Sequence, residues 1–87
     1  MEPRESFVRS HFIELLSEKF GINKEKAQQY PSEPLLGETF GLCSFDLVYL
    51  YAFVEKTFGI RFSEEDVTNY KLLTIDNWVT TILKKIG

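Results

Sequence analysis

The sequence predicts a small all-α fold, a four-helix bundle with a long loop between the first and second helices and a short third helix. Apolar residues recur at helical spacing in four segments, helix-capping residues and glycines mark the segment ends, and no useful length of sequence alternates as a β-strand would. We expect helices at about 5–20, 44–58, 63–69 and 74–86, within a single domain that covers residues 1–87.

The first predicted helix has an apolar face and a charged face. The apolar face comprises Val8, Phe12, Leu15, Leu16 and Phe20, and the charged face Glu5, Arg9, Glu14, Glu18 and Lys19. A glycine and then an isoleucine follow Phe20, and the same pair follows Phe58 at the end of the second helix. Glycine accepts the left-handed backbone of a helix stop, and the isoleucine can fold back onto the last turn.

Polar caps define the last two helices. Ser63 is a favoured N-cap for the third, and Glu64, Glu65 and Asp66 suit the positive end of its dipole. Thr74 caps the fourth. Its apolar face comprises Ile75, Trp78, Val79, Ile82, Leu83 and Ile86, and Lys84 and Lys85 occupy its last turn.

Residues 23–43 form the predicted long loop. Prolines 31 and 34 and glycines 37 and 41 argue against a continuous helix there. Several of its residues are apolar and should pack onto the bundle, namely Tyr30, Leu35, Leu36, Phe40 and Leu42. A loop of this length in a small domain often has a functional reason.

Composition excludes several classes of protein. Ten basic and thirteen acidic residues give a net charge of −3 and no basic stripe, which argues against nucleic-acid binding. The longest apolar run, residues 47–54, is far shorter than the roughly 20 residues of a membrane span. The start MEPRESF does not resemble a secretory signal, and a single cysteine forms no internal disulfide, so we expect a cytoplasmic monomer.

The sequence lacks most catalytic constellations, and we expect no enzyme. His11, the only histidine, has no companion ligand for a metal and is expected to be a partly buried, hydrogen-bonded imidazole. The acidic cluster at 64–66 is expected to be a solvated helix start. The stretch GETFG lacks the lysine and glycine spacing of a phosphate loop.

The stretch GLCSFDLVYL places Cys43 and Ser44 just ahead of a helix that is apolar almost all round. Serine is a favoured N-cap, and this structural role alone would explain Ser44. The site also follows a long loop, where scaffolds often display functional groups. A helix N-terminus stabilises an attached phosphate through its free N–H groups and its dipole.

The second helix would be the central one. Its interior positions are expected to be Leu47, Val48, Leu50, Tyr51, Val54 and Phe58. Phe45, Tyr49, Ala52 and Phe53 are not accommodated by that interior. Some of them either form an exposed aromatic surface beside Ser44, where interface anchors are common, or merely cover the loop.

The stretch GLCSFDLVYLYAFVEKTFGIRFSEEDV resembles the core motif of acyl carrier proteins, which has Asp-Ser-Leu at the start of helix two, a hydrophobic helix with an acidic-aromatic end, and a short acidic third helix. The matching positions are Gly41, Ser44, Phe45 in place of the leucine, Asp46, Val48, Leu50, Glu55, Phe58 and 62–67. The likeness in helix layout and first loop covers most of the chain.

The resemblance implies a carrier function. A phosphopantetheinyl transferase would attach phosphopantetheine from coenzyme A to the Ser44 hydroxyl, which would make the chain a phosphoprotein. The terminal thiol would hold an acyl or aminoacyl intermediate as a thioester. Loading enzymes would supply this cargo and other enzymes would use it, in fatty-acid, secondary-metabolite or peptide-modification biosynthesis.

Three departures from the family pattern indicate a specialised member with its own partners. Cys43 replaces the usual aspartate before the serine, and Phe45 replaces leucine. Helix two is also less acidic, with Tyr49, Ala52 and Lys56 where acids commonly meet partner enzymes. The expected partner-binding residues are Cys43, Phe45, Asp46, Tyr49 and Ala52.

Two other functions fit the sequence. A degenerate carrier fold could act as an unmodified protein-binding adaptor, with Ser44 only a helix cap. Alternatively, Cys43 could be the reactive group, because a helix N-terminus can promote thiolate chemistry, although the sequence offers neither a neighbouring base nor a resolving cysteine.

Overall fold

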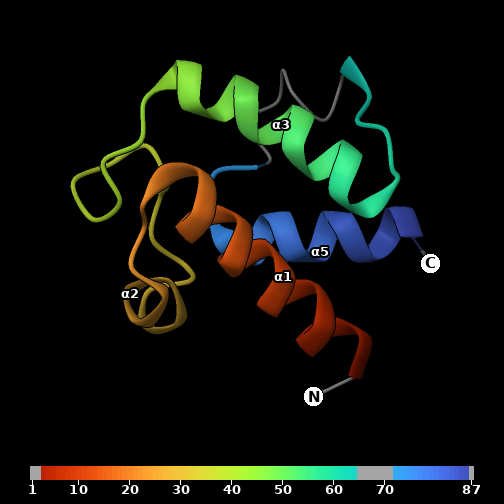
Figure 1. The fold of residues 1–87 in the computed structure, drawn as a ribbon, viewed down its shortest axis with the longest axis horizontal. Coiled ribbons are helices and arrows are strands. Elements are labelled where there is room, and N and C mark those ends of the chain that lie inside the picture. Colours follow the sequence, from red (N-terminus) through yellow and green to blue (C-terminus); the bar gives the residue numbers. More distant parts are fainter. Residues whose placement is uncertain (1–2, 65–71, 87) are drawn as a thin grey trace.

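The computed structural model describes residues 3–64 and 72–86, and within these ranges the chain is all-α (Figure 1). The described helices are α1 (Pro3–Phe20), α2 (Lys24–Gln29), α3 (Ser44–Phe58) and α5 (Ile75–Ile86), and no β-strand occurs among the described residues. Three of the four predicted helices are confirmed. Of the predicted helix at 63–69, Ser63 is not helical and Glu64 is helical, and residues 65–69 lie outside the described residues.

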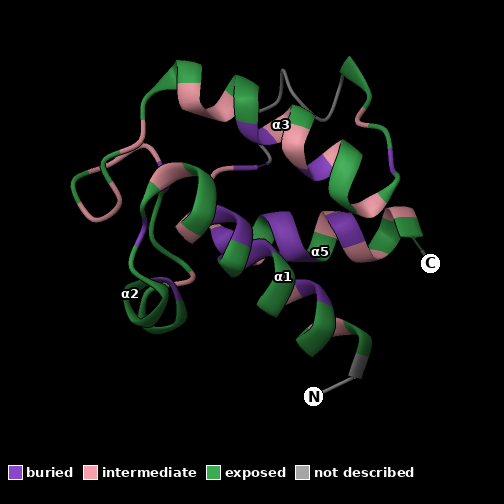
Figure 2. Ribbon diagram, viewed as in Figure 1, coloured by how far each residue is buried: buried purple, intermediate pink, exposed green. Residues whose placement is uncertain are grey.

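Helices α1 and α5 form the centre of the structure (Figure 1). Phe12 of α1 stacks on Trp78 of α5, with ring centroids 5.3 Å apart. At one end of the pair, the Arg9 guanidinium lies 2.9 Å from the Asp76 carboxylate. The buried apolar faces of the two helices turn toward each other (Figure 2), and they comprise Val8, Phe12, Ile13, Leu15 and Leu16 from α1 and Ile75, Trp78, Val79 and Ile82 from α5.

Helix α3 is not the central helix that its apolar sequence predicts. It lies along one side of the α1–α5 pair and buries only Leu50 and Val54 completely. Val48, which we expected in the interior, is 64% exposed. The interior of the described structure is filled by α5 instead. A helix that packs along one side leaves the opposite side in water whatever residues it carries, and this explains the exposed apolar face of α3.

The predicted helix stops are confirmed. Gly21 and Gly59 adopt left-handed backbone with φ of 70° and 66°. Ile22 and Ile60 then turn back, are buried, and donate N–H groups to the Leu16 and Glu55 carbonyls at 3.3 and 3.2 Å. Thr74 is confirmed as the cap of α5, since its Oγ1 accepts the Asn77 N–H at 3.1 Å.

The long loop contains a helix that the sequence analysis missed. The Asn23 side chain caps α2 by accepting the Lys26 N–H at 3.0 Å, and Ala27 is the buried contact of this helix. Its six residues are too few to show an apolar period, but the Asn23 cap and Pro31 beyond the end are recognisable signals. Tyr30, which we expected to pack down, is 43% exposed.

The rest of the loop is fastened to the start of α5. The Leu35 N–H donates to the Leu73 carbonyl at 2.7 Å, and Pro34 pairs with Thr74 in an isolated antiparallel bridge. The Asp76 N–H donates to the Pro31 carbonyl at 3.0 Å. Leu35 is buried as predicted, and these bonds bring the loop and the segment before α5 together near the N-terminus of α3.

Candidate functional site

The N-terminus of α3 is capped by Cys43 and Asp46. Cys43 is the N-cap in extended backbone, and its N–H donates to Asp46 Oδ2 at 3.0 Å. Ser44 is the first helical residue, so the alternative interpretation in which it serves only as the N-cap is wrong. No hydrogen bond joins the Ser44 hydroxyl to any described residue, and the residue is exposed. Its hydroxyl is therefore accessible and is not needed for capping.

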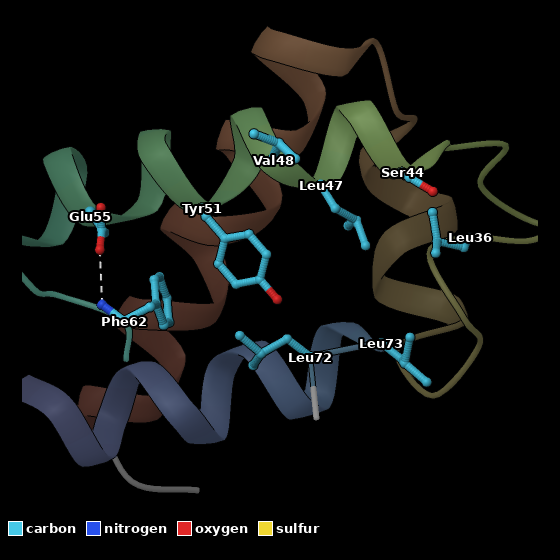
Figure 3. Close-up of a pocket in the computed structure, with 9 residues that line it drawn as sticks. All are labelled: Leu36, Ser44, Leu47, Val48, Tyr51, Glu55, Phe62, Leu72 and Leu73. Atoms are coloured by element: carbon cyan, nitrogen blue, oxygen red, sulfur yellow. Dashed lines mark hydrogen bonds between the residues drawn. The ribbon is translucent and has the colours of Figure 1, made fainter. Parts of the chain in front are cut away.

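Ser44 stands at one end of an apolar cavity of about 440 Å³, which we call the Ser44 groove (Figure 3). α3 forms one wall, and the segment just before α5 forms the facing wall. The groove is lined by Leu36, Ser44, Leu47, Val48, Tyr51, Glu55, Phe62, Leu72 and Leu73.

Ser44 and Glu55 lie at opposite ends of the groove. Figure 3 shows Ser44 beside Leu36 at one end, Glu55 beside Phe62 at the other, and Tyr51 between them. Ser44 and Glu55 are eleven positions apart on α3, about 16 Å at 1.5 Å per residue. The groove can therefore hold an extended chain that starts near the serine.

Aromatic rings close the end of the groove near Glu55. Tyr51 and Phe62 meet edge to face at 5.2 Å, and both contact Trp78 beneath them, at 4.9 and 5.4 Å. The Phe62 N–H donates to Glu55 Oε2 at 2.8 Å, and this bond fastens the segment after Gly59 to α3. These contacts fix both groove walls at this end.

The solvent-facing side of α3 carries the expected aromatic surface in part. Phe45 is 77% and Tyr49 61% exposed, Ala52 is exposed, and Val48 joins this outward face and also lines the groove. Phe53, in contrast, is partly buried against Phe20 and does not belong to this face. We call Phe45, Val48, Tyr49 and Ala52 the outward face.

The structure places the other expected partner-binding residues at the start of the outward face. Cys43 is exposed with a free thiol, and Asp46 is half-buried and accepts the Cys43 N–H through its carboxylate. Ser44, Cys43, Phe45 and Asp46 thus share one helical turn, and Tyr49 and Ala52 continue from it along α3.

The expectation for His11 is wrong in one respect. The residue is exposed rather than partly buried, although its imidazole is hydrogen-bonded: Nδ1 lies 3.0 Å from the Phe7 carbonyl oxygen. The ring centroids of His11 and Phe7 are 4.1 Å apart, with the two planes tilted by 32°. Across 3–64 and 72–86, no three His, Cys, Asp or Glu side chains gather as metal ligands would. In the same ranges, no helix combines the length and apolar character that crossing a membrane requires.

The sequence analysis identified Ser44 but not the groove. Its facing wall depends on two Leu-Leu pairs far apart in the sequence, at 35–36 and 72–73. In each pair the first leucine is buried in the core and the second lines the groove, and the buried Leu72 also contributes to the lining. The doublets are visible in the sequence, but the hydrogen bond from Leu35 to Leu73 that joins them is not.

A scan of family models and a search of curated proteins both return no match to this sequence. The function of the chain is therefore inferred from the residues and the geometry of the site.

Proposed function

We propose that the chain is a carrier protein that holds an acyl or aminoacyl intermediate as a thioester on a phosphopantetheine arm attached to Ser44. The observation that carries this proposal is an exposed serine hydroxyl, engaged by none of the described residues, at the first turn of α3 and at the mouth of an apolar groove.

The first turn of α3 suits a phosphodiester. The first N–H groups of a helix have no partners within the helix, and they and the dipole favour a negative group attached there. In the attachment step the Ser44 oxygen would form a bond to the phosphorus that bears pantetheine in coenzyme A. The nucleoside bisphosphate would leave, and the hydroxyl proton would pass to the transferase or to water.

The apolar lining of the Ser44 groove favours a carrier function over a catalytic one. Its described lining is mainly aliphatic and aromatic, and it offers a sheltered surface for a cargo between enzymes. The outward face would meet the transferase and the loading and acyl-using enzymes, since large exposed aromatic residues such as Phe45 and Tyr49 are common interface anchors.

The test is the intact mass of the protein after incubation with coenzyme A and a broad-specificity phosphopantetheinyl transferase. We expect a gain of one phosphopantetheinyl group, lost in Ser44→Ala and retained in Ser32→Ala, which changes an exposed serine in the loop before α3. No gain, or a gain that survives Ser44→Ala, would contradict the proposal.

An adaptor function is the second candidate, and the outward face favours it, because an apolar surface can bind a protein partner without any modification. The replacement of the usual aspartate by Cys43 also favours the adaptor function. In this case partner binding would be unchanged in Ser44→Ala and lost in Phe45→Ala.

A further inference from the structure

We propose that the Ser44 groove selects a cargo with an apolar body and an ammonium group at its far end, and that Glu55 binds this ammonium. This inference rests on the proposed carrier function and specifies its cargo.

The order of side chains along the groove supports this chemistry. Between Ser44 and Glu55 the lining side chains include Leu47, Tyr51 and Leu72, which favour an apolar chain. Among the described residues of the lining, Glu55 is the one charged residue, and it lies at the end opposite the serine. The extended phosphopantetheine arm is itself about as long as the groove, so the cargo would enter beside Ser44 with the arm folded back outside the groove. The far end of a cargo that enters in this way meets the Glu55 carboxylate.

The Glu55 carboxylate retains capacity for another partner. Oε2 accepts the Phe62 N–H, and a carboxylate has lone pairs for several donors. Lys56 and Arg61 line a neighbouring hollow with Glu55, but within the described ranges no ion pair joins either of them to it. A half-buried carboxylate beside apolar surface is stabilised when a cation pairs with it.

The aromatic rings at this end favour a cation as well. Phe62 and Tyr51 lie beside Glu55 in the lining, and an ammonium near their faces would be attracted by the ring electrons. Phe62 already interacts with a cation, since the Lys85 ammonium lies 5.5 Å from its ring centroid. A carboxylate on the cargo would instead meet the like charge of Glu55.

Glu55 could alternatively serve only to hold the Phe62 backbone. Glu55→Gln separates the two roles, because the glutamine amide oxygen can still accept the Phe62 N–H while the charge is removed. Glu14→Gln, on the exposed side of α1 and outside the groove lining, is the matched control.

The experiment titrates the unmodified protein with decylamine and decanol below their micelle concentrations, and follows the backbone amide signals of Phe62, Leu72 and Leu73 by NMR. We expect decylamine to bind about tenfold more tightly than decanol, which corresponds to about 1.4 kcal/mol. Glu55→Gln should reduce this ratio to below about twofold, and Glu14→Gln should preserve it.

Equal affinity for the two ligands, binding of neither, or a preference that survives in Glu55→Gln would overturn the inference. Unchanged far-UV circular dichroism of Glu55→Gln verifies that the variant folds. The mass experiment at Ser44 distinguishes the two proposals: a mass gain without amine preference contradicts only the cargo class, and amine preference without a mass gain contradicts only the carrier function.

Discussion

Adjacent residues at the start of α3 have different physical roles. Asp46 stabilises the helix end through its bond to the Cys43 N–H and through its charge near the positive end of the dipole. Ser44 contributes no capping bond among the described residues. The residue with the reactive hydroxyl is thus separate from the residue that holds the backbone in place, and a serine variant can test function without a large change in stability.

This separation predicts unequal costs for two alanine variants. Asp46→Ala should lower the free energy of unfolding by about 1 kcal/mol, because it removes a capping bond and a favourable charge. Ser44→Ala should change it by less than about 0.5 kcal/mol. Urea unfolding followed by the fluorescence of Trp78, the only tryptophan, measures both. A Ser44→Ala cost equal to that of Asp46→Ala would mean that the hydroxyl caps the helix.

At the scale of elements, α3 shows why an apolar sequence does not determine burial. Val48 and Leu50 lie in the same apolar run, yet Val48 is exposed and Leu50 is fully buried. Which side of such a helix faces the core depends on the position of its neighbours, and α3 packs along one side of the α1–α5 pair.

Truncation should therefore cost little at an exposed ring of α3 and much at a buried ring of α1. Phe45→Ala should leave the free energy of unfolding within about 0.5 kcal/mol of wild type, because the ring is largely in water. Phe12→Ala should lower it by about 3–5 kcal/mol, because the ring is fully buried against Trp78. Thermal unfolding by circular dichroism compares them. A Phe45→Ala cost above about 2 kcal/mol would show that the outward face is packed.

The cap of α5 also supports the loop. Thr74→Val removes the oxygen that accepts the Asn77 N–H, and the variant should lose about 1 kcal/mol of stability. Thr74 also pairs with Pro34, so amide exchange should accelerate at Leu35 and Asp76 more than in the middle of α1. Thr80→Val, at an exposed position within α5, is the control. Unchanged exchange at Leu35 would show that the loop is held independently of the cap.

Local sequence signals predicted the ends of the helices correctly. The groove and the packing of α3 depend on contacts between distant segments, which the sequence does not show. Gly21, Gly59 and Thr74 act through neighbours a few residues away, so their roles are visible in the sequence. The Ser44 groove instead needs Leu36 and Leu73, which hydrogen bonds between distant segments bring together. The packing of α3 on one side of the core is equally a property of the assembled chain.

At the scale of the whole molecule, one aromatic cluster joins the core to the groove. Trp78 of α5 contacts Phe12 of α1, Tyr51 of α3 and Phe62 of the segment after α3. Tyr51 and Phe62 also line the groove. Binding in the groove is therefore expected to change the fluorescence of Trp78, although Trp78 is fully buried and does not line the groove.

Substitutions at Trp78 test how much of the fold depends on this cluster. Trp78→Ala should cost about 3–5 kcal/mol, a large fraction of the 5–15 kcal/mol that stabilises a typical domain. Trp78→Phe should cost about 1–2 kcal/mol, because it keeps an aromatic ring and removes an indole N–H that is buried without a hydrogen-bond partner among the described residues. Thermal unfolding followed by far-UV circular dichroism ranks the two variants. If Trp78→Phe were as destabilised as Trp78→Ala, the indole N–H would have to be hydrogen-bonded in solution, and the cluster would depend on that bond as well as on ring packing.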